Sequence, residues 1–302
     1  MKKVFWTGKL SPSLWLIVNA GSALAWVTGN ARNISAMKQR HRDGYNGVYT
    51  DYVSRYDELG LDHFNKISTA FLEKVGVNGK EVLELGCGTG ALSILALEKG
   101  AAKMVCSDIS KKMIDQCRAK IASKGYSEKI IEFREIDAES LPLSDNSVDV
   151  VISSMVLGMI PDQAKAVAEM TRVLRPGGTI AIATQGPEYY KEAIMALLNS
   201  MTMRYFLGYR FEFWPREEDD MKNLFAKCGL ENIDIKRLVW VENFENGGKT
   251  FDFFASTSGL WWYDQLPTEL RERETIKTRR YFERKKVNHV TTDIVCAYAT
   301  KT

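Results

Sequence analysis

The chain has little net charge of either sign. Its 302 residues include 41 lysines and arginines against 38 aspartates and glutamates, which leaves a formal charge of +3 at pH 7. Proteins that bind nucleic acid through the phosphate backbone usually carry a strongly basic surface. The balance of charge therefore argues against nucleic acid as a partner.

Thiols and imidazoles are also few. The cysteines are odd in number and scattered, and no Cys-x-x-Cys pair occurs: Cys87, Cys106, Cys117, Cys228 and Cys296. Neither a zinc site nor a disulfide framework is expected, and a reduced cytoplasm is the expected location. The three histidines, His41, His63 and His289, lie far apart, so no metal site is expected.

A long uninterrupted apolar run is missing at the N-terminus. Residues 13–27 are apolar but contain Asn19, Gly21 and Ser22, and the run is too short to cross a membrane. The basic start and Ala23-Leu-Ala25 are features of a secretory signal, but we expect the segment to stay on the chain as a helix. A helix packed on the core and a helix touching a membrane surface both remain open.

The stretch Glu81-Val-Leu-Glu-Leu-Gly-Cys-Gly-Thr-Gly90 organises the rest of the chain. It predicts a short buried strand that ends at three glycines spaced by two, and residues 91–97 predict a helix. This order brings backbone close to a nucleotide-like ligand, because glycine tolerates positive φ and has no Cβ. The segment Gly86-Cys-Gly-Thr-Gly-Ala91 also fits the dinucleotide fingerprint, so the loop alone leaves the ligand open.

Two aspartates follow the next two predicted strands. Residues 102–107 predict a strand that ends at Asp108, whose carboxylate is placed to accept both ribose hydroxyls or to cap the following helix. Residues 128–136 predict a third strand, followed by Asp137. This carboxylate is either an acceptor for an adenine amino group or an ordinary turn aspartate.

The later pattern completes an α/β chain. The remaining predictions are a strand at 147–154, a helix at 162–174, a turn at 175–178 and strands at 179–184, 233–241 and 292–299. Strands that alternate with helices predict a parallel, doubly wound sheet, whose ligands lie at the carboxyl ends of the strands. We therefore expect Gly86, Asp108, Asp137 and Ser153 to converge.

With these motifs the chain resembles the class I S-adenosylmethionine-dependent methyltransferases over roughly residues 55–185. The resemblance is carried by Glu84-Leu-Gly-Cys-Gly-Thr-Gly90, Asp108, Asp137-Ala138, Ser147-Val-Asp-Val-Val151 and Leu174-Arg-Pro-Gly-Gly178. It implies a seven-stranded, mostly parallel Rossmann-like sheet and S-adenosylmethionine as the methyl donor. The loop after the fourth strand, Ser153-Ser-Met-Val156, lacks the Asn-Pro-Pro-Tyr or Asp-Pro-Pro-Tyr sequence of amino-directed nucleic-acid methyltransferases.

The resemblance also implies a role for each site residue. Glu84 would lie near the ammonium of the donor, and Gly86 and Gly88 near its methionine part. Asp108 would bind the ribose, Ile109 would pack on the adenine face, and Asp137 and the Ala138 amide would contact the adenine edge. Ser153 would lie near the sulfonium, and Tyr56 would touch the donor from an N-terminal lid.

The expected acceptor is a small, apolar or aromatic molecule. Tyr56-Asp57 and the stretch after Asp137 look most like the small-molecule methyltransferases, including those of ubiquinone and menaquinone biosynthesis. Residues 189–214 and 251–263 are rich in aromatic side chains, which suit such an acceptor or a cationic amine. In-line displacement needs alignment and exclusion of water. No catalytic residue is assigned, although Tyr49 and His63 are candidates for a general base.

The expected organisation is a helical N-terminal lid at 1–60 and a methyltransferase domain at 61–302, with cap inserts at about 187–228 and 243–289. The tyrosines at 45, 49, 52 and 56 lie along one side of a predicted helix, as a packing stripe or as a lid that presents a phenol. Two other functions stay open: a non-catalytic S-adenosylmethionine-binding protein, and an NAD(P)-dependent oxidoreductase. The oxidoreductase function leaves Asp137 and the turn at 175–178 without a role.

Overall fold

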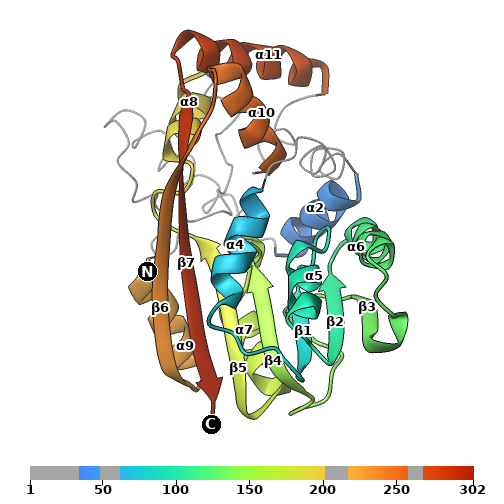
Figure 1. The fold of residues 1–302 in the computed structure, drawn as a ribbon. Helices are drawn as coiled ribbons and strands as arrows, with labels where there is room; N and C mark the ends of the chain where they lie inside the picture. The colour runs from blue at the N-terminus through green and yellow to red at the C-terminus, as the bar shows by residue number, and fades with distance from the viewer. Residues whose placement is uncertain (1–33, 48–61, 201–216, 258–267) are drawn as a thin grey trace.

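The computed structural model describes residues 34–47, 62–200, 217–257 and 268–302. Seven strands form one sheet in the order β3-β2-β1-β4-β5-β7-β6 (Figure 1). The strands are β1 (Glu81–Leu85), β2 (Lys103–Asp108), β3 (Ile131–Glu135), β4 (Val148–Ser154), β5 (Leu174–Gln185), β6 (Leu230–Asn243) and β7 (His289–Lys301). The α-helices are α2 (Ile34–Asn46), α4 (His63–Leu72), α5 (Ala91–Glu98), α6 (Lys111–Ser123), α7 (Gln163–Val173), α8 (Lys191–Ser200), α9 (Glu218–Lys227), α10 (Gly247–Thr257) and α11 (Thr268–Arg284).

The strand pairing confirms the predicted α/β class and the seven-stranded, mostly parallel sheet. Strand β1 lies in the middle, where Val82 is aligned with Met104 of β2 and with Val150 of β4 in parallel ladders. Strand β7 pairs antiparallel with both β5 and β6. Because β1, β2 and β4 run in one direction, their carboxyl ends lie at the same edge of the sheet.

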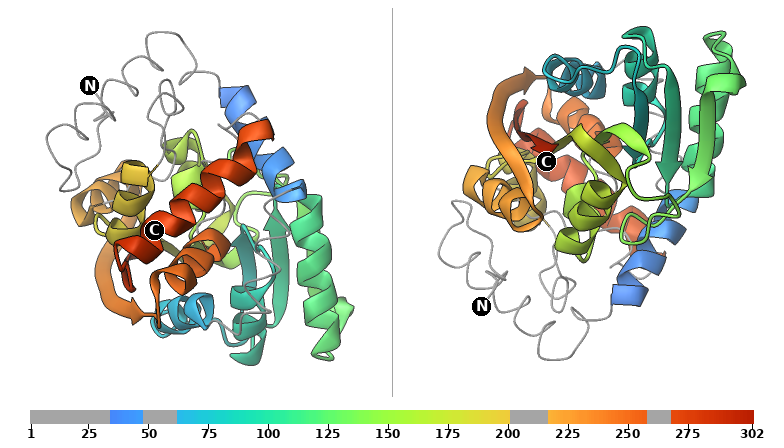
Figure 2. Two further views of the ribbon diagram at one scale, coloured as in Figure 1. Left: turned by 90° about the horizontal axis from the view of Figure 1, so that it is seen from above. Right: turned by 90° about the horizontal axis from the view of Figure 1, so that it is seen from below.

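Apolar side chains cover both faces of the sheet. Val82 and Leu83 are adjacent in β1, but they belong to different core clusters because successive side chains of a strand point to opposite faces. Helices α4, α5 and α6 contribute to the first cluster, and α7 and α9 contribute to the second (Figures 1 and 2). Burial on both faces explains why the central strands β1 and β4 are buried along nearly their whole length, unlike the edge strands β3 and β6.

The predicted turn at 175–178 is wrong as a separate element. Those residues belong to β5, where the pairing with β4 shifts register between Val148 and Val150 and Gly177 has φ of 76°. The Arg175 guanidinium explains why the chain is held there: Nη1 lies 2.8 Å from Asp149, and Nη2 lies 2.6 Å from Glu81. The motif therefore ties the beginnings of β1, β4 and β5 together, at the end of the sheet away from the glycine loop.

The third predicted strand is shorter than expected. Its first residues form a 3₁₀ turn, Glu128–Ile130, and β3 begins at Ile131. Strand β5 begins five residues earlier than predicted, at Leu174, and the other predicted strands in the sheet are confirmed within three residues at each end.

Strands β6 and β7 extend beyond the ends of the other strands toward α8, α10 and α11, which lie at one end of the molecule (Figure 1). Within the described part of the chain, no helix is long and apolar enough to cross a membrane. The apolar run at 13–27, Tyr49, Tyr52, Tyr56 and much of the two aromatic inserts lie outside the described residues.

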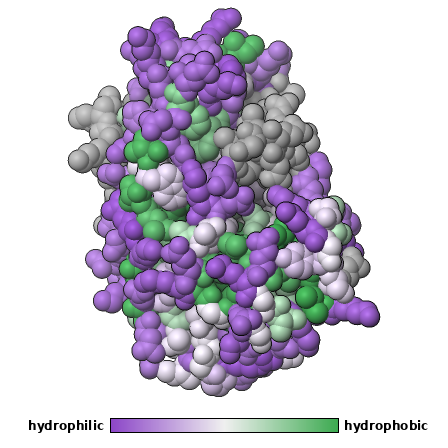
Figure 3. Space-filling view, viewed as in Figure 1, coloured by the Kyte–Doolittle hydropathy of each residue, from purple (hydrophilic) through white to green (hydrophobic). Residues whose placement is uncertain are grey.

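The visible surface is largely hydrophilic, with small apolar patches (Figure 3). Val239 and Val241 contribute exposed apolar side chains on the edge strand β6. In contrast to these exposed valines, Phe225 of α9 is fully buried in the second core cluster.

We predict that Phe225→Ala lowers the free energy of unfolding by about 3–5 kcal/mol, because it leaves a cavity in a close-packed core. The matched change Val239→Ala on the exposed edge strand is expected to stay within about 0.5 kcal/mol of the parent. Denaturant unfolding of both variants measures the difference. Equal effects would contradict the assignment of Phe225 to the core.

Candidate functional site

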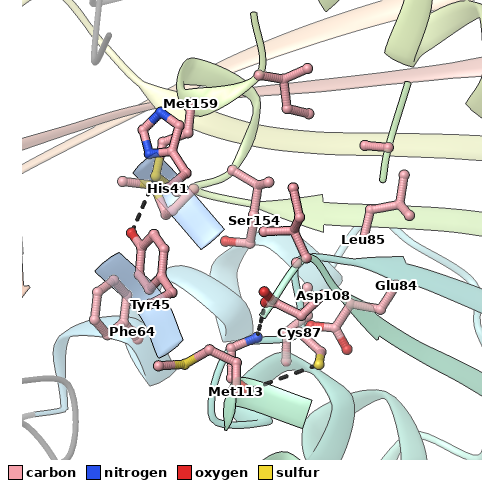
Figure 4. Close-up of a pocket in the computed structure, with 18 of the residues that line it drawn as sticks. His41, Tyr45, Phe64, Glu84, Leu85, Cys87, Asp108, Met113, Ser154 and Met159 are labelled. Carbon is pink, nitrogen blue, oxygen red and sulfur yellow. Dashed lines mark hydrogen bonds between the residues drawn. The ribbon is translucent and has the colours of Figure 1, made fainter. Parts of the chain in front are cut away.

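One elongated cavity opens at the carboxyl ends of β1, β2 and β4. Its lining includes most of the site residues predicted from the sequence: Glu84, Gly86, Gly88, Asp108, Ile109, Asp137 and Ala138. Figure 4 shows His41 and Tyr45 of α2 on one side of the cavity and Asp108 and Cys87 on the other. The structure thus brings together residues from separate predicted elements.

The three glycines of the loop after β1 serve different purposes. Gly86, Gly88 and Gly90 all have positive φ, at 74°, 50° and 91°. A Cβ on Gly86 would lie 2.2 Å from Val156, and one on Gly90 would lie 2.9 Å from the Cys117 sulfur. A Cβ on Gly88 would meet no atom of the described residues within 4 Å, so this position leaves space in the cavity for a ligand.

Asp108 points its carboxylate at the glycine loop. Oδ2 accepts a hydrogen bond from the Gly88 amide at 3.1 Å, and Oδ1 accepts one from the Ser110 amide at 2.9 Å. Burial raises the pKa of Asp108 to about 6, although both amides oppose the shift. The helix-cap alternative for Asp108 is wrong, because Ser110 is the N-cap of α6 and its hydroxyl accepts from the Met113 amide.

Asp137 lies under the N-terminal helix α2. The Lys38 ammonium of that helix is 2.6 Å from Asp137 Oδ2 and 2.9 Å from Glu139 Oε2. The Glu139 amide donates to Asp137 Oδ1 at 2.9 Å. Burial acts to raise the pKa of Asp137, but Lys38 and the Glu139 amide outweigh it and lower the pKa below the usual value.

Glu84 lies beneath the loop and is 2% exposed. Burial raises the pKa of its carboxyl to about 8, although the hydroxyl of Ser93 donates to it and opposes the shift. Below the loop, the Cys117 thiol interacts with the thiols of both Cys87 and Cys106. All five cysteines are free thiols.

The structure corrects the prediction that Ser153 belongs to the site. It is fully buried, its hydroxyl donates to the Leu85 carbonyl at 3.0 Å, and it does not line the cavity. The next residue of β4, Ser154, lines the cavity instead, because neighbouring side chains of a strand point to opposite faces. Tyr56 and the candidate base Tyr49 lie outside the described residues.

The end of the cavity away from Asp137 is apolar. Phe64, Tyr189, Tyr190, Ile194 and Phe254 line it. The other candidate base, His63, does not line the cavity but lies behind Tyr190, with which it shares a hydrogen bond of 2.9 Å.

The sequence reasoning missed Lys38, Glu139 and Met159. Nothing in the local pattern indicates that Lys38 contacts Asp137, because the two residues are 99 positions apart. The sequence did indicate Tyr45, because it is the first tyrosine of the predicted stripe along one side of a helix. Its hydroxyl donates to the Met159 sulfur at 3.2 Å, and burial together with the charge of Asp108 raises its pKa.

Comparison with known proteins identifies the family to which the chain belongs. A family model described as a methyltransferase domain matches residues 83–182. The ubiquinone/menaquinone biosynthesis C-methyltransferase UbiE of Francisella philomiragia is 34% identical over 221 residues, which are 64% of this chain and 85% of the relative. The chain belongs to the class I S-adenosylmethionine-dependent methyltransferases. A demethylmenaquinone methyltransferase of Desulfitobacterium hafniense is 31% identical over 179 residues, which are 53% of this chain and 70% of the relative.

Solved structures agree on the methyltransferase fold. A phosphoethanolamine N-methyltransferase of Haemonchus contortus, solved with S-adenosylhomocysteine, superposes with a TM-score of 0.50 at 16% identity, over 78% of this chain and 52% of that one. The [4+2]-cyclase SpnF superposes with a TM-score of 0.52 at 16% identity, over 78% and 81%. This methyltransferase therefore uses S-adenosylmethionine as its donor, and the interpretation of the glycine loop as a site for NAD(P) is wrong.

We predict that Gly88→Ala weakens binding of S-adenosylhomocysteine to this methyltransferase about 5- to 150-fold, because overpacking costs about 1–3 kcal/mol. Gly79→Ala is the matched control, since Gly79 also has positive φ and open space but lies outside the cavity. Both variants should lose about 1–2 kcal/mol of stability from left-handed strain. Calorimetric titration separates the two effects, and equal affinities would contradict the placement of Gly88.

Proposed function

We propose that this methyltransferase transfers the methyl group to a small, apolar or aromatic molecule by in-line displacement. The observation that supports the proposal is one cavity with two different ends. The acidic residues that line its described part, Glu84, Asp108, Asp137 and Glu139, are grouped around the glycine loop and α2, whereas the opposite end combines aromatic and aliphatic side chains with a few uncharged polar ones. The first end suits the donor, and the second suits an acceptor with an apolar ring.

We assign Asp108 to the ribose of the donor. Each carboxylate oxygen accepts one backbone amide, which fixes the orientation of the group and leaves further lone pairs for hydroxyl donors. The pKa of about 6 keeps the carboxylate ionised at neutral pH. The two acceptor oxygens of one carboxylate match the two neighbouring hydroxyls of a ribose.

We assign the adenine to the part of the cavity lined by Ile109, Asp137 and Ala138. Lys38 of α2 lies against the same carboxylate and leaves the second lone pair of each oxygen of Asp137 for an amino donor. Since α2 also places Tyr45 on the cavity wall, we propose that it belongs to a lid over the donor. Tyr56 stays a prediction within that lid.

We assign the methionine part of the donor to Glu84, Gly86 and Gly88. Glu84 is buried and has a raised pKa in the free chain, so a neighbouring ammonium would favour its ionised form. The donor supplies a methyl group made electrophilic by a positively charged sulfur. The protein residues hold the two reactants in line and exclude water, from which much of the rate can come.

The names of the relatives support the choice of acceptor class. UbiE of Francisella philomiragia is a C-methyltransferase of ubiquinone and menaquinone biosynthesis, and the Desulfitobacterium hafniense relative is a demethylmenaquinone methyltransferase. We therefore propose an acceptor with an aromatic or quinone-derived ring.

The acceptor class is tested with S-adenosylmethionine labelled in the methyl group. We expect label to pass to members of a panel of hydroquinones and phenols, and not to oligonucleotides or to proteins of an extract. Exclusive labelling of a macromolecule, with donor binding intact, would contradict the proposed small-molecule function.

The ribose assignment predicts that donor binding depends on pH. Burial raises the pKa of Asp108 to about 6, so the carboxyl takes up a proton as the pH falls through 6. A neutral carboxyl accepts hydroxyl hydrogen bonds less well than a carboxylate. We therefore expect the affinity for S-adenosylhomocysteine to decrease below pH 6, as measured by calorimetric titration.

The variant Asp108→Asn should weaken binding about 10- to 100-fold, because hydrogen bonds to a charged group contribute about 1.5–3 kcal/mol. It should also flatten the pH dependence around 6. Asp115→Asn is the control, because Asp115 is an exposed carboxylate on α6, the helix that follows Asp108. Unchanged donor affinity in Asp108→Asn would refute the ribose assignment.

A further inference from the structure

Tyr190, His63 and Glu242 come from distant parts of the chain and lie in a row behind the apolar end of the cavity. Tyr190 borders the cavity, and its hydroxyl lies 2.9 Å from Nε2 of His63. On the other side of the imidazole, Nδ1 lies 3.7 Å from Oε1 of Glu242. Nδ1 makes no hydrogen bond with any described residue. A proton on Nδ1 would therefore face the carboxylate alone.

The row is held rigidly. The rings of Phe64, Trp240 and Phe253 surround His63, with centroid distances of 5.3, 5.9 and 5.3 Å. The indole of Trp240 also donates to Glu242 at 2.6 Å, which orients the carboxylate.

The backbone of Tyr190 is strained. Its φ of 52° lies in the left-handed region, which costs of order 1–3 kcal/mol for a residue with a side chain. The Tyr190 amide donates to the Thr291 carbonyl at 2.7 Å and holds this conformation. Such strain is typical of sites where a side chain must point in one direction.

The charges around His63 favour its neutral form. Burial lowers its pKa below the usual value, opposed by Glu242 and assisted by Lys66. The position of His63 at the first residue of α4 acts in the same direction, because a helix N-terminus disfavours positive charge. His63, Trp240 and Lys66 lower the pKa of Glu242 to about 2. Among the described residues that contact this imidazole, the ionisable ones from outside α4 are Tyr190 and Glu242.

We propose that Tyr190 is the catalytic base of this methyltransferase, that His63 takes up the Tyr190 proton while Glu242 faces the other side of the imidazole as a positioning residue, and that the acceptor carries a phenolic hydroxyl. The proposal deepens the proposed function and depends on it. A phenolic acceptor and Tyr190 have similar intrinsic pKa values of about 10, so the proton passes between them with little free-energy change. A cationic amine would favour a carboxylate, and no described residue at this end of the cavity is acidic.

The step balances in atoms and charge. The acceptor O–H bond breaks and its proton passes to the Tyr190 oxygen, while the Tyr190 proton passes to Nε2 of His63. The electron pair of the acceptor forms the bond to the methyl carbon, and the S–CH₃ bond breaks with its pair on sulfur. If the ring carbon is methylated instead, its hydrogen returns to the ring oxygen. In both cases the positive charge lost by the sulfur ends on the His63 imidazolium beside Glu242.

The first test needs no acceptor. The chain has three histidines, so ¹⁵N-histidine NMR of the full chain with S-adenosylhomocysteine can resolve them. We expect His63 at pH 7 to be neutral, with its proton on Nδ1, and its Nε2 signal to shift in Tyr190→Phe. Tyr298→Phe is the control, because this buried hydroxyl donates to the Phe71 carbonyl away from the cavity. A proton on Nε2 would overturn the proposal, since that atom could not accept another.

The second test compares two acceptors in the full-length enzyme. One is a hydroquinone or phenol that wild type methylates, and the other is its fluorinated analogue, which is already ionised at the assay pH. On the first, Tyr190→Phe should lower kcat about 10²–10⁴-fold, the usual contribution of a general base, with little change in KM. On the second, it should keep most of the wild-type rate. His63→Gln should remove the decrease of kcat/KM at acidic pH, and Tyr298→Phe should match wild type.

The outcomes separate this proposal from the function on which it rests. Equal losses on both acceptors would show a structural role for Tyr190 and overturn the proposal. Transfer to amines or thiols, but to no phenol, would also overturn it and leave small-molecule methyl transfer intact. Donor binding without transfer to any small molecule would contradict the proposed function itself.

Discussion

Parallel pairing of β1 with β2 is the constraint on which the rest of the site depends. The ladder continues past the end of β1, because the amides of Gly86 and Cys87 both donate to the Ser107 carbonyl, at 2.7 and 2.8 Å. The glycine loop therefore turns beside the end of β2, where the Asp108 carboxylate accepts the Gly88 amide. The backbone of one strand thus shapes the loop of the next, and the loop in turn orients the carboxylate.

The cavity separates charge from apolar surface along its length. Carboxylates stand at the ends of β1, β2 and β3, and Lys38 of α2 compensates part of that charge through Asp137 and Glu139. The opposite end is built from α4, α8 and α10, which contribute Phe64, Ile194 and Phe254. A polar donor and an apolar acceptor would each meet a matching surface, and the reactive bond would lie between them, where water is excluded.

Secondary structure and many of the residues that line the cavity were predictable from the sequence. The buried strand at 81–85, the glycines and Asp108 are local signals, because strand periodicity and turn chemistry act over a few residues. Ser153 shows the limit of that reasoning. Its position at the end of β4 was right, but a shift of one residue reverses the direction of a side chain, and Ser154 lines the cavity instead.

The sequence by itself determined the α/β class, the order of strands and helices, the glycine loop and the acids that follow β2 and β3. Only the tertiary structure decided which side chains meet across long separations. Lys38 joins Asp137, and Glu242 of the edge strand β6 approaches His63 behind Tyr190. These contacts depend on how α2 packs over the sheet and how far β6 and β7 extend. No local periodicity records such arrangements, because they arise from the burial of whole faces rather than from the preference of any short segment.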